Sequence, residues 1–151
     1  MRALLQRVKR ASVSIEGKVN GAIGEGLFIL FGVEDTDDAA ELDWLVSKIV
    51  QMRIFSDENG LMNRSVADVD GEILVVSQFT LFAKTKKGNR PSFIAAARPE
   101  KAVPIYESFV EKLSQALGKT VPTGEFGADM QIDMLADGPV TIIIDTQNKD
   151  L

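Results

Sequence analysis

The chain has 151 residues and is 45% hydrophobic, enough to bury the core of one domain over residues 1–151. It has no cysteine and no histidine, which excludes disulfides, thiolate catalysis and Ser-His or Cys-His hydrolase chemistry. No convincing cluster of carboxylates is present, so we expect neither a metal nor another cofactor. There is no apolar run of about 18 residues. The first seven residues lack the apolar stretch of a signal peptide, so we do not expect one. We therefore expect a cytoplasmic protein without membrane contact.

The net charge of −5 opposes general binding to nucleic acid, but the charge is unevenly placed. Residues 84–101 carry six basic side chains and one acidic side chain. The closest group of basic residues is Lys84, Lys86, Lys87 and Arg90. A basic patch on an acidic chain suits a specific contact with a polyanion, whereas a solvated loop is the plainer alternative for a charge run alone.

The start of the chain predicts β structure. Residues 2–16 alternate between apolar and polar side chains, with a slip near Arg10-Ala11 that predicts a bulge or bend. Asn20-Gly21 is typical of a tight turn. The fully apolar run 26–33 predicts a central strand.

Two helices are expected. The acidic stretch 34–38 precedes the first, which Asp35 or Thr36 can cap. The apolar side chains that would place this helix on the sheet are Leu42, Leu45, Val46 and Ile49. The second helix should start near Val103, because Pro104 fits the first turn of a helix, and Gly118 should end it.

The remaining segments read as strands. Residues 72–82 predict a second central strand, and 130–135 and 140–144 predict two last strands that 137–139 join. The mixed order of strands and helices predicts an α/β fold, a single domain with helices against a curved sheet.

Residues 72–93 hold the most informative stretch of the chain. A continuous apolar run ends at Val76 and is followed by Ser77-Gln78-Phe79-Thr80 and then by the basic loop. Buried polar groups cost free energy unless they are paired, so these side chains need a reason. Either they pair with backbone where a strand ends, or they form a polar site beside a patch that attracts anions.

Two motifs carry a resemblance to a known family. Residues 77–81 (Ser-Gln-Phe-Thr-Leu), with 87–93 (Lys-Gly-Asn-Arg-Pro-Ser-Phe), resemble the signature of the D-aminoacyl-tRNA deacylases. Residues 138–141 (Gly-Pro-Val-Thr) resemble that family's second motif, the Gly-cis-Pro element. The resemblance extends over nearly the whole chain. It implies a three-layer α/β domain with a curved, barrel-like mixed sheet flanked by two main helices, assembled as a homodimer.

The resemblance also implies an activity. Members of the family hydrolyse the ester that links a D-amino acid to the 3′-terminal adenosine of tRNA, and they also remove glycine mischarged on tRNA-Ala. The implied partners are therefore D-aminoacyl-tRNA, glycyl-tRNA and a second copy of the chain. Hydrolysis frees the tRNA and keeps D-residues out of translation.

The implied catalytic residues are Ser77, Gln78, Phe79 and Thr80. An aminoacyl ester is already activated, so the site needs a positioned water and a donor for the oxyanion more than a strong base. Main-chain N–H groups near Phe79 and Thr80 can serve the oxyanion, and the substrate's 2′-hydroxyl can help activate the water. The Phe79 ring is expected in the core. Thr80 is the alternative nucleophile, which we disfavour because its neighbours in the sequence include no base.

Selection between stereoisomers is implied for Gly138 and Pro139, which in the family enter the active site of the other subunit. D- and L-amino acids have the same atoms, so discrimination needs a rigid obstacle where the L side chain would lie. Arg7 is the implied residue that orients this element. Phe126 and Met130 are expected to line the pocket, with simple core as the alternative, and the contacts to tRNA phosphates are assigned to Lys84, Lys86, Lys87 and Arg90.

Two other functions compete with the deacylase. One is a non-catalytic RNA-binding module that uses the basic loop. The other is a hydrolase of small D-amino-acid esters or amides with Thr80 as its nucleophile. Turnover of charged tRNA distinguishes the deacylase from the first, and the activity of Thr80→Ala distinguishes it from the second.

Overall fold

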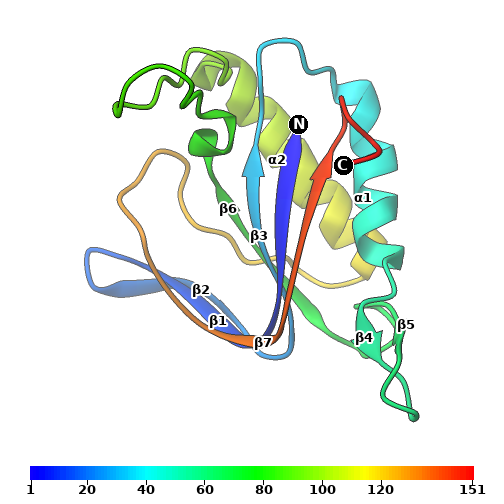
Figure 1. Ribbon diagram of the computed structural model, residues 1–151. Helices are drawn as coiled ribbons and strands as arrows, with labels where there is room; N and C mark the ends of the chain where they lie inside the picture. Colours follow the sequence, from blue (N-terminus) through cyan, green and yellow to red (C-terminus); the bar gives the residue numbers. More distant parts are fainter.

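A computed structural model describes residues 1–151 (Figure 1). The strands of its main sheet are β1 (Arg2–Ile15), β2 (Lys18–Ile23), β3 (Gly26–Gly32), β6 (Glu72–Ser77) and β7 (Gln131–Asp145). The sheet has the order β2-β1-β3-β6, with β7 on the other edge of β1. The other elements are η1 (Ala39–Glu41), α1 (Leu42–Gln51), β4 (Phe55–Ser56), β5 (Met62–Arg64), η2 (Phe79–Phe82) and α2 (Pro99–Leu117).

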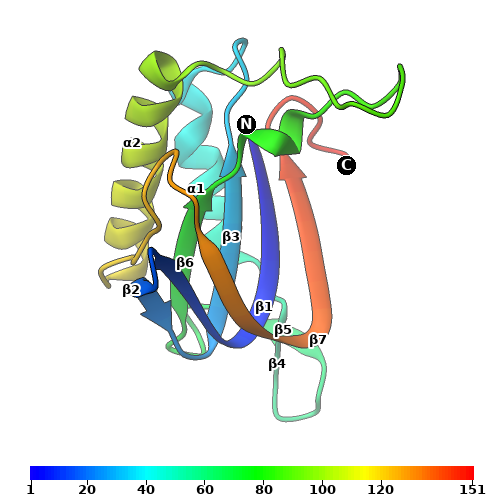
Figure 2. The same cartoon turned by 90° about the vertical axis from the view of Figure 1, so that its left-hand side faces the viewer.

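The long strand β1 curls the sheet. Its first half pairs with β3 and its second half with β2, while β7 follows it along both halves. The pairing of β1 with β7 shifts between Val8 and Arg10, which confirms the predicted slip. The outer halves of β1 and β7 therefore fold across the sheet, and both helices cover its opposite face (Figures 1 and 2). The predicted α/β fold with a curved mixed sheet and two helices is confirmed.

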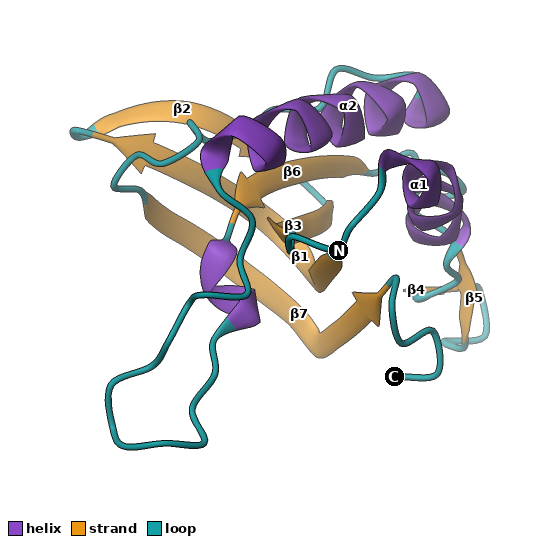
Figure 3. Cartoon of the chain, turned by 90° about the horizontal axis from the view of Figure 1, so that it is seen from above, coloured by secondary structure: helices purple, strands orange, loops and turns teal.

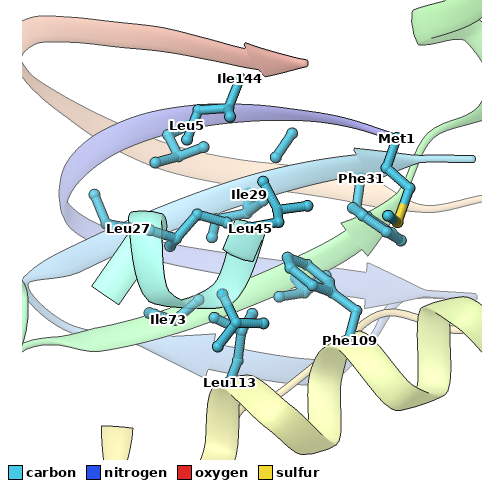
Figure 4. Close-up of a cluster of buried hydrophobic side chains, with 14 of the residues drawn as sticks. Met1, Leu5, Leu27, Ile29, Phe31, Leu45, Ile73, Phe109, Leu113 and Ile144 are labelled. Atoms are coloured by element: carbon cyan, nitrogen blue, oxygen red, sulfur yellow. The ribbon is translucent and has the colours of Figure 1, made fainter. Parts of the chain in front are cut away.

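Alternation along the two inner strands divides the core into two clusters. Residues 27, 29 and 31 of β3 face α1 and α2, together with 73 and 75 of β6. In this larger cluster the rings of Phe31 and Phe109 stack at 4.1 Å between centroids (Figure 4). Phe28, Leu74 and Val76 point the other way and pack under the curled part of the sheet. Both faces of β3 and β6 are buried, which explains their continuous apolar sequence.

Several predicted boundaries are wrong. The first turn lies at Glu16-Gly17, where both residues have positive φ, and Gly21 lies inside β2 instead. Asp38, not Asp35 or Thr36, caps the first helical turn by accepting a hydrogen bond from Ala40 N–H. These are choices between neighbouring residues of similar propensity, which tertiary contacts decide.

The second helix also starts earlier than predicted. α2 begins at Pro99, and Pro104 lies inside it. The missing N–H of Pro104 removes one hydrogen bond near the start of a long helix, and the helix survives because it packs its apolar face on the sheet. Gly118 ends the helix as predicted, with φ of 72° and its N–H donating to Ser114 O at 2.9 Å.

The last two predicted strands form one long strand, β7, with an irregular section in its middle. Gln6 pairs with Thr141 and Val8 pairs with Ala136, so the four residues 137–140 stand opposite the single residue Arg7. We call residues 137–140 the β7 bulge. No helix of the structure is long and apolar enough to cross a membrane.

Candidate active site

A pocket of about 240 Å³ opens where β3 and β6 end. Eleven of the 15 residues that line it are hydrophobic, and none of the 15 carries a charge. They come from the ends of both strands, from α2 and from the segment that leads into β7: Phe31, Gly32, Val33, Val76, Ser77, Gln78, Phe79, Ala97, Ala102, Tyr106, Phe126, Gly127, Ala128, Met130 and Ile132. We call this the strand-end pocket.

Parallel pairing brings the motif residues to this edge. β3 and β6 run in the same direction, with Phe31 beside Ser77, so both strands end at one edge of the sheet. Gln78 N–H still donates to Phe31 O at 2.7 Å, and the chain then turns into η2. The predicted strand over 72–82 therefore stops at Ser77. Carboxyl ends of neighbouring parallel strands are a common place for ligand sites in α/β proteins.

Three of the four expected catalytic residues line the pocket and one does not. Ser77, Gln78 and Phe79 line the pocket, whereas Thr80 does not. The Gln78 side-chain amide donates to the Thr80 hydroxyl. An amide cannot take a proton from a hydroxyl, so this contact does not activate Thr80 as a nucleophile.

The expectation that the Phe79 ring is core is wrong. The residue is 55% exposed, and its ring meets that of Phe93 edge to face, with 5.1 Å between the centroids. The reason is that the strand has already ended, so the alternation that buries every second side chain no longer applies.

The floor of the pocket is aromatic. Tyr106 of α2 is 6% exposed and donates its hydroxyl to Val75 O at 3.3 Å, and its ring meets Phe126 edge to face at 5.8 Å. Burial raises the pKa of Tyr106 to about 12, although a hydrogen bond with the Thr123 side chain acts the other way. Tyr106 is therefore neutral near pH 7. The helical pattern placed it on the buried face, but nothing in the sequence linked it to the site.

Gly138 and Pro139 lie in the β7 bulge, both exposed, and the peptide bond between them is cis. Arg7, buried opposite the bulge, donates to Ile54 O at 2.7 Å and to Asp137 O at 3.3 Å. Its guanidinium also forms an ion pair with the Asp137 carboxylate at 3.1 Å. Arg7 reaches Gly138 as well, since a Cβ there would lie 3.2 Å from Arg7 Nη2. Sequence reasoning missed Asp137, whose only signal was its place beside Gly138.

The bulge and the pocket of one chain do not meet. Neither Gly138 nor Pro139 lines the pocket. Arg7 pairs with Leu27 near the start of β3, whereas Phe31 and Gly32 at its end line the pocket. At the rise of an extended strand these positions are roughly 15 Å apart, and the bend of β7 and the end of β6 lie at opposite ends of the sheet (Figure 1).

The basic residues project from the pocket edge on a loop. Lys84 and Ser92 exchange both main-chain hydrogen bonds, at 2.8 and 3.0 Å, so residues 84–92 form a closed hairpin, which we call the basic hairpin (Figure 3). Its cations are all exposed, and none takes part in an ion pair: Lys84, Lys86, Lys87 and Arg90.

Comparison with known proteins identifies the family. The profile of the family described as D-Tyr-tRNA(Tyr) deacylase matches residues 4–145. This chain belongs to that family. A relative from Bacteroides fragilis, named D-aminoacyl-tRNA deacylase, is 59% identical over 99% of this chain and 100% of its own length. A relative of the same name from Flavobacterium johnsoniae is 56% identical with the same coverage.

Two solved structures share the fold. A structure titled c-Myc DNA Unwinding Element Binding Protein has a TM-score of 0.90 and 44% identity, covering 96% of this chain and 98% of its own. A structure described as a probable eukaryotic D-amino acid tRNA deacylase has a TM-score of 0.82 over 95% and 97% of the two chains. At 18% identity, this second likeness concerns the fold alone.

Proposed function

We propose that this protein is a D-aminoacyl-tRNA deacylase, an ester hydrolase that releases a free D-amino acid and tRNA. Its membership in the family supports the reaction. The observation that carries the assignment to a site is the strand-end pocket, where the Ser77–Phe79 motif meets an apolar hollow without a charged side chain. Such a pocket suits a flat, uncharged group, and we assign it to the terminal adenosine and its ester.

The proposed chemistry relies on the backbone and on the substrate. The main-chain N–H groups of Phe79 and Thr80 stabilise the oxyanion that forms when water attacks the ester carbonyl. The ribose 2′-hydroxyl of the substrate assists the water. The pocket holds no carboxylate, lysine or arginine, and the chain has no histidine, so no side chain there can serve as a general base. Ser77 and Gln78 fix the geometry of the pocket and contact the adenosine.

We propose that chiral selection comes from a second copy of the chain. Gly138 and Pro139 of the β7 bulge are exposed, Arg7 and Asp137 hold them in place, and they lie far from the pocket of their own chain. β7 also exposes apolar side chains, which a homodimer would cover: Ile132, Met134, Leu135 and Ile143. In this homodimer Gly138-Pro139 of one protomer lies over the pocket of its partner and excludes an L side chain. Glycine has no side chain to exclude, so glycyl-tRNA is a second substrate.

The test is the rate at which purified protein deacylates D-tyrosyl-tRNA and L-tyrosyl-tRNA. We expect rapid loss of the D ester while the L ester is spared. Equal, slow loss of both esters would refute the proposal and favour an RNA-binding role. The same assay with glycyl-tRNA tests the second substrate. A tRNA substrate also places the activity in the cytoplasm, where aminoacyl-tRNA is used.

Mixing of variants tests the shared site. Ala128→Trp should fill the pocket and Arg7→Ala should release the bulge, so each variant alone should lose selective deacylation. A mixed dimer contains one site with an intact pocket and an intact bulge. We therefore expect recovery of D-selective activity when the two variants are unfolded and refolded together, and no recovery would contradict a site shared between protomers.

A further inference from the structure

A pair of aromatic rings, one exposed and one half-buried, links the strand-end pocket to the basic hairpin. Phe79 lines the pocket and also meets Phe93, the residue that follows the hairpin, with the two rings inclined at 80°. Phe79 is 55% exposed, and the next apolar residue, Ile94, is 80% exposed. Large apolar side chains usually avoid such exposure when they are adjacent, so this patch is a candidate contact surface.

The charges beside the pair indicate what kind of partner it takes. The four cations of the basic hairpin have no acidic partner in the structure, and the hairpin itself contains no acid. Ion pairs elsewhere on the surface do engage lysine and arginine, as at Lys112–Asp43 and Arg64–Glu58. Exposed aromatic rings next to unpaired cations are the usual chemistry for single-stranded nucleic acid, whose bases stack and whose phosphates seek positive charge.

We propose that Phe79 and Phe93 form a stacking platform for the unpaired nucleotide that precedes the terminal adenosine of tRNA. The basic hairpin then holds the phosphates of the same single-stranded end. This inference rests on the proposed function, because the terminal adenosine must occupy the strand-end pocket. Phe79 belongs to both the pocket and the platform, so the two binding sites are adjacent, as two consecutive nucleotides require.

Phe93 is the residue to test, because Phe79 is part of the proposed catalytic machinery. Phe93→Tyr keeps a π face, Phe93→Leu keeps apolar bulk without one, and Phe93→Ala keeps neither. Each is compared on two substrates: D-tyrosyl-tRNA, and the D-tyrosyl ester of adenosine alone, which lacks the preceding nucleotide.

Loss of one stacked base costs roughly 1–3 kcal/mol, so we expect Phe93→Ala to lower kcat/KM on the tRNA by roughly tenfold or more. Phe93→Leu should show a similar loss and Phe93→Tyr little. On the adenosine ester all three variants should match the wild type. Loss of Lys86 or Lys87 should weaken tRNA binding and reduce the slope of log affinity against log salt by about one unit each. Lys112→Ala removes the same charge from the outer helical face and should leave that slope unchanged.

Three outcomes would overturn the inference. Equal losses on both substrates would mean that Phe93 only supports the fold of the pocket. Wild-type behaviour of Phe93→Leu on the tRNA would mean that bulk and not stacking is required. Conversion of a dimer to a monomer by Phe93→Ala, in sedimentation, would mean that a second copy of the chain covers the patch.

Failure of the proposed function is separately recognisable, because the wild type would then hydrolyse neither substrate. In that case binding of a short single-stranded RNA ending in CCA decides the matter. Binding that is tenfold weaker for Phe93→Ala and Phe93→Leu supports the platform, and unchanged binding overturns it.

Discussion

The strand-end pocket and the β7 bulge belong to one sheet but differ in charge and in exposure. The pocket is a hollow without a charged side chain, and its walls come from the ends of buried strands. The exposed tip of the bulge, Gly138 and Pro139, is held from behind by the Arg7 guanidinium and the Asp137 carboxylate. Under the proposed function this difference is a division of labour: the uncharged hollow strengthens weak main-chain donors, and the exposed tip meets a substrate held in the pocket of the partner protomer.

The largest effect is expected from removing Arg7, the side chain that supports the bulge. Arg7→Ala should leave Ile54 O without its donor and Asp137 with Lys9, at 3.5 Å, as its remaining cation. We expect a cost of about 2 kcal/mol of unfolding free energy, as for a lost hydrogen bond to a charged group. It should also narrow the ratio of D- to L-tyrosyl-tRNA deacylation more than it lowers the D rate. Urea unfolding and the two rates measure this. An unchanged ratio in a folded variant would show that Arg7 does not orient the bulge.

A substitution that disturbs the pocket lining should instead change KM and leave the ratio of D- to L-tyrosyl-tRNA deacylation unchanged. A Cβ at Gly124 would lie 2.3 Å from Met130 Sδ, so Gly124→Ala must displace the Met130 side chain, which lines the pocket. We expect KM to rise by about tenfold, equivalent to about 1.4 kcal/mol, with the D/L ratio preserved. Gly24→Ala is the control, because its nearest neighbour there, Glu72 Oε1, is 3.5 Å away. A changed ratio would contradict the separation of the two regions.

Thr80→Ala tests whether the Thr80 hydroxyl takes part in the reaction assigned to the pocket. The Thr80 hydroxyl accepts from the Gln78 amide and does not line the pocket. Loss of one hydrogen bond of about 1 kcal/mol should lower kcat by about fivefold. Complete loss of activity with an intact fold would instead identify Thr80 as the nucleophile. Single-turnover deacylation of D-tyrosyl-tRNA distinguishes these results.

Tyr106→Phe should have the smallest effect, a loss of stability that depends on pH. At pH 8 the variant should be less stable by about 1 kcal/mol, since one hydrogen bond is lost. Because burial raises the pKa of Tyr106 to about 12, the tyrosine stabilises the fold fully below the unfolded pKa, about 10, and this contribution is lost as the pH rises toward the folded value. The gap between wild type and variant should therefore shrink between pH 10 and 12. Urea unfolding across this range measures it, and a constant gap would argue against burial of the hydroxyl.

Local sequence was enough to predict the inner strands, because both faces of β3 and β6 are buried and leave a continuous apolar run. It was also enough for the bend in β1 and for the end of α2 at Gly118. It was not enough for Pro104, where packing of the whole helix outweighs one missing hydrogen bond. The exposure of Phe79 depends on where β6 ends, and that boundary is set by its pairing with β3.

The sequence predicted the motifs of the site. It did not predict that the pocket and the β7 bulge of one chain lie apart. The tie between Arg7 and Asp137 joins residues 130 positions apart, and no local pattern reports it. Tyr106 is one more apolar-face residue of α2 until the fold places it under the pocket. The distance between Gly138 and the pocket follows from strand register alone, which the sequence of either strand does not reveal.

In the β7 bulge, four residues stand opposite the single residue Arg7, and this arrangement affects which substitutions the strand tolerates. Pairing with β1 is regular again at Ala136 on one side and at Thr141 on the other, so the sheet closes around the insertion. Its exposed tip, Gly138 and Pro139, can therefore be altered without shifting the inward and outward faces of the flanking strand. Under the proposed function, the stereochemical preference can therefore be redesigned at this tip while the pairing of β7 with β1 on both sides stays in register.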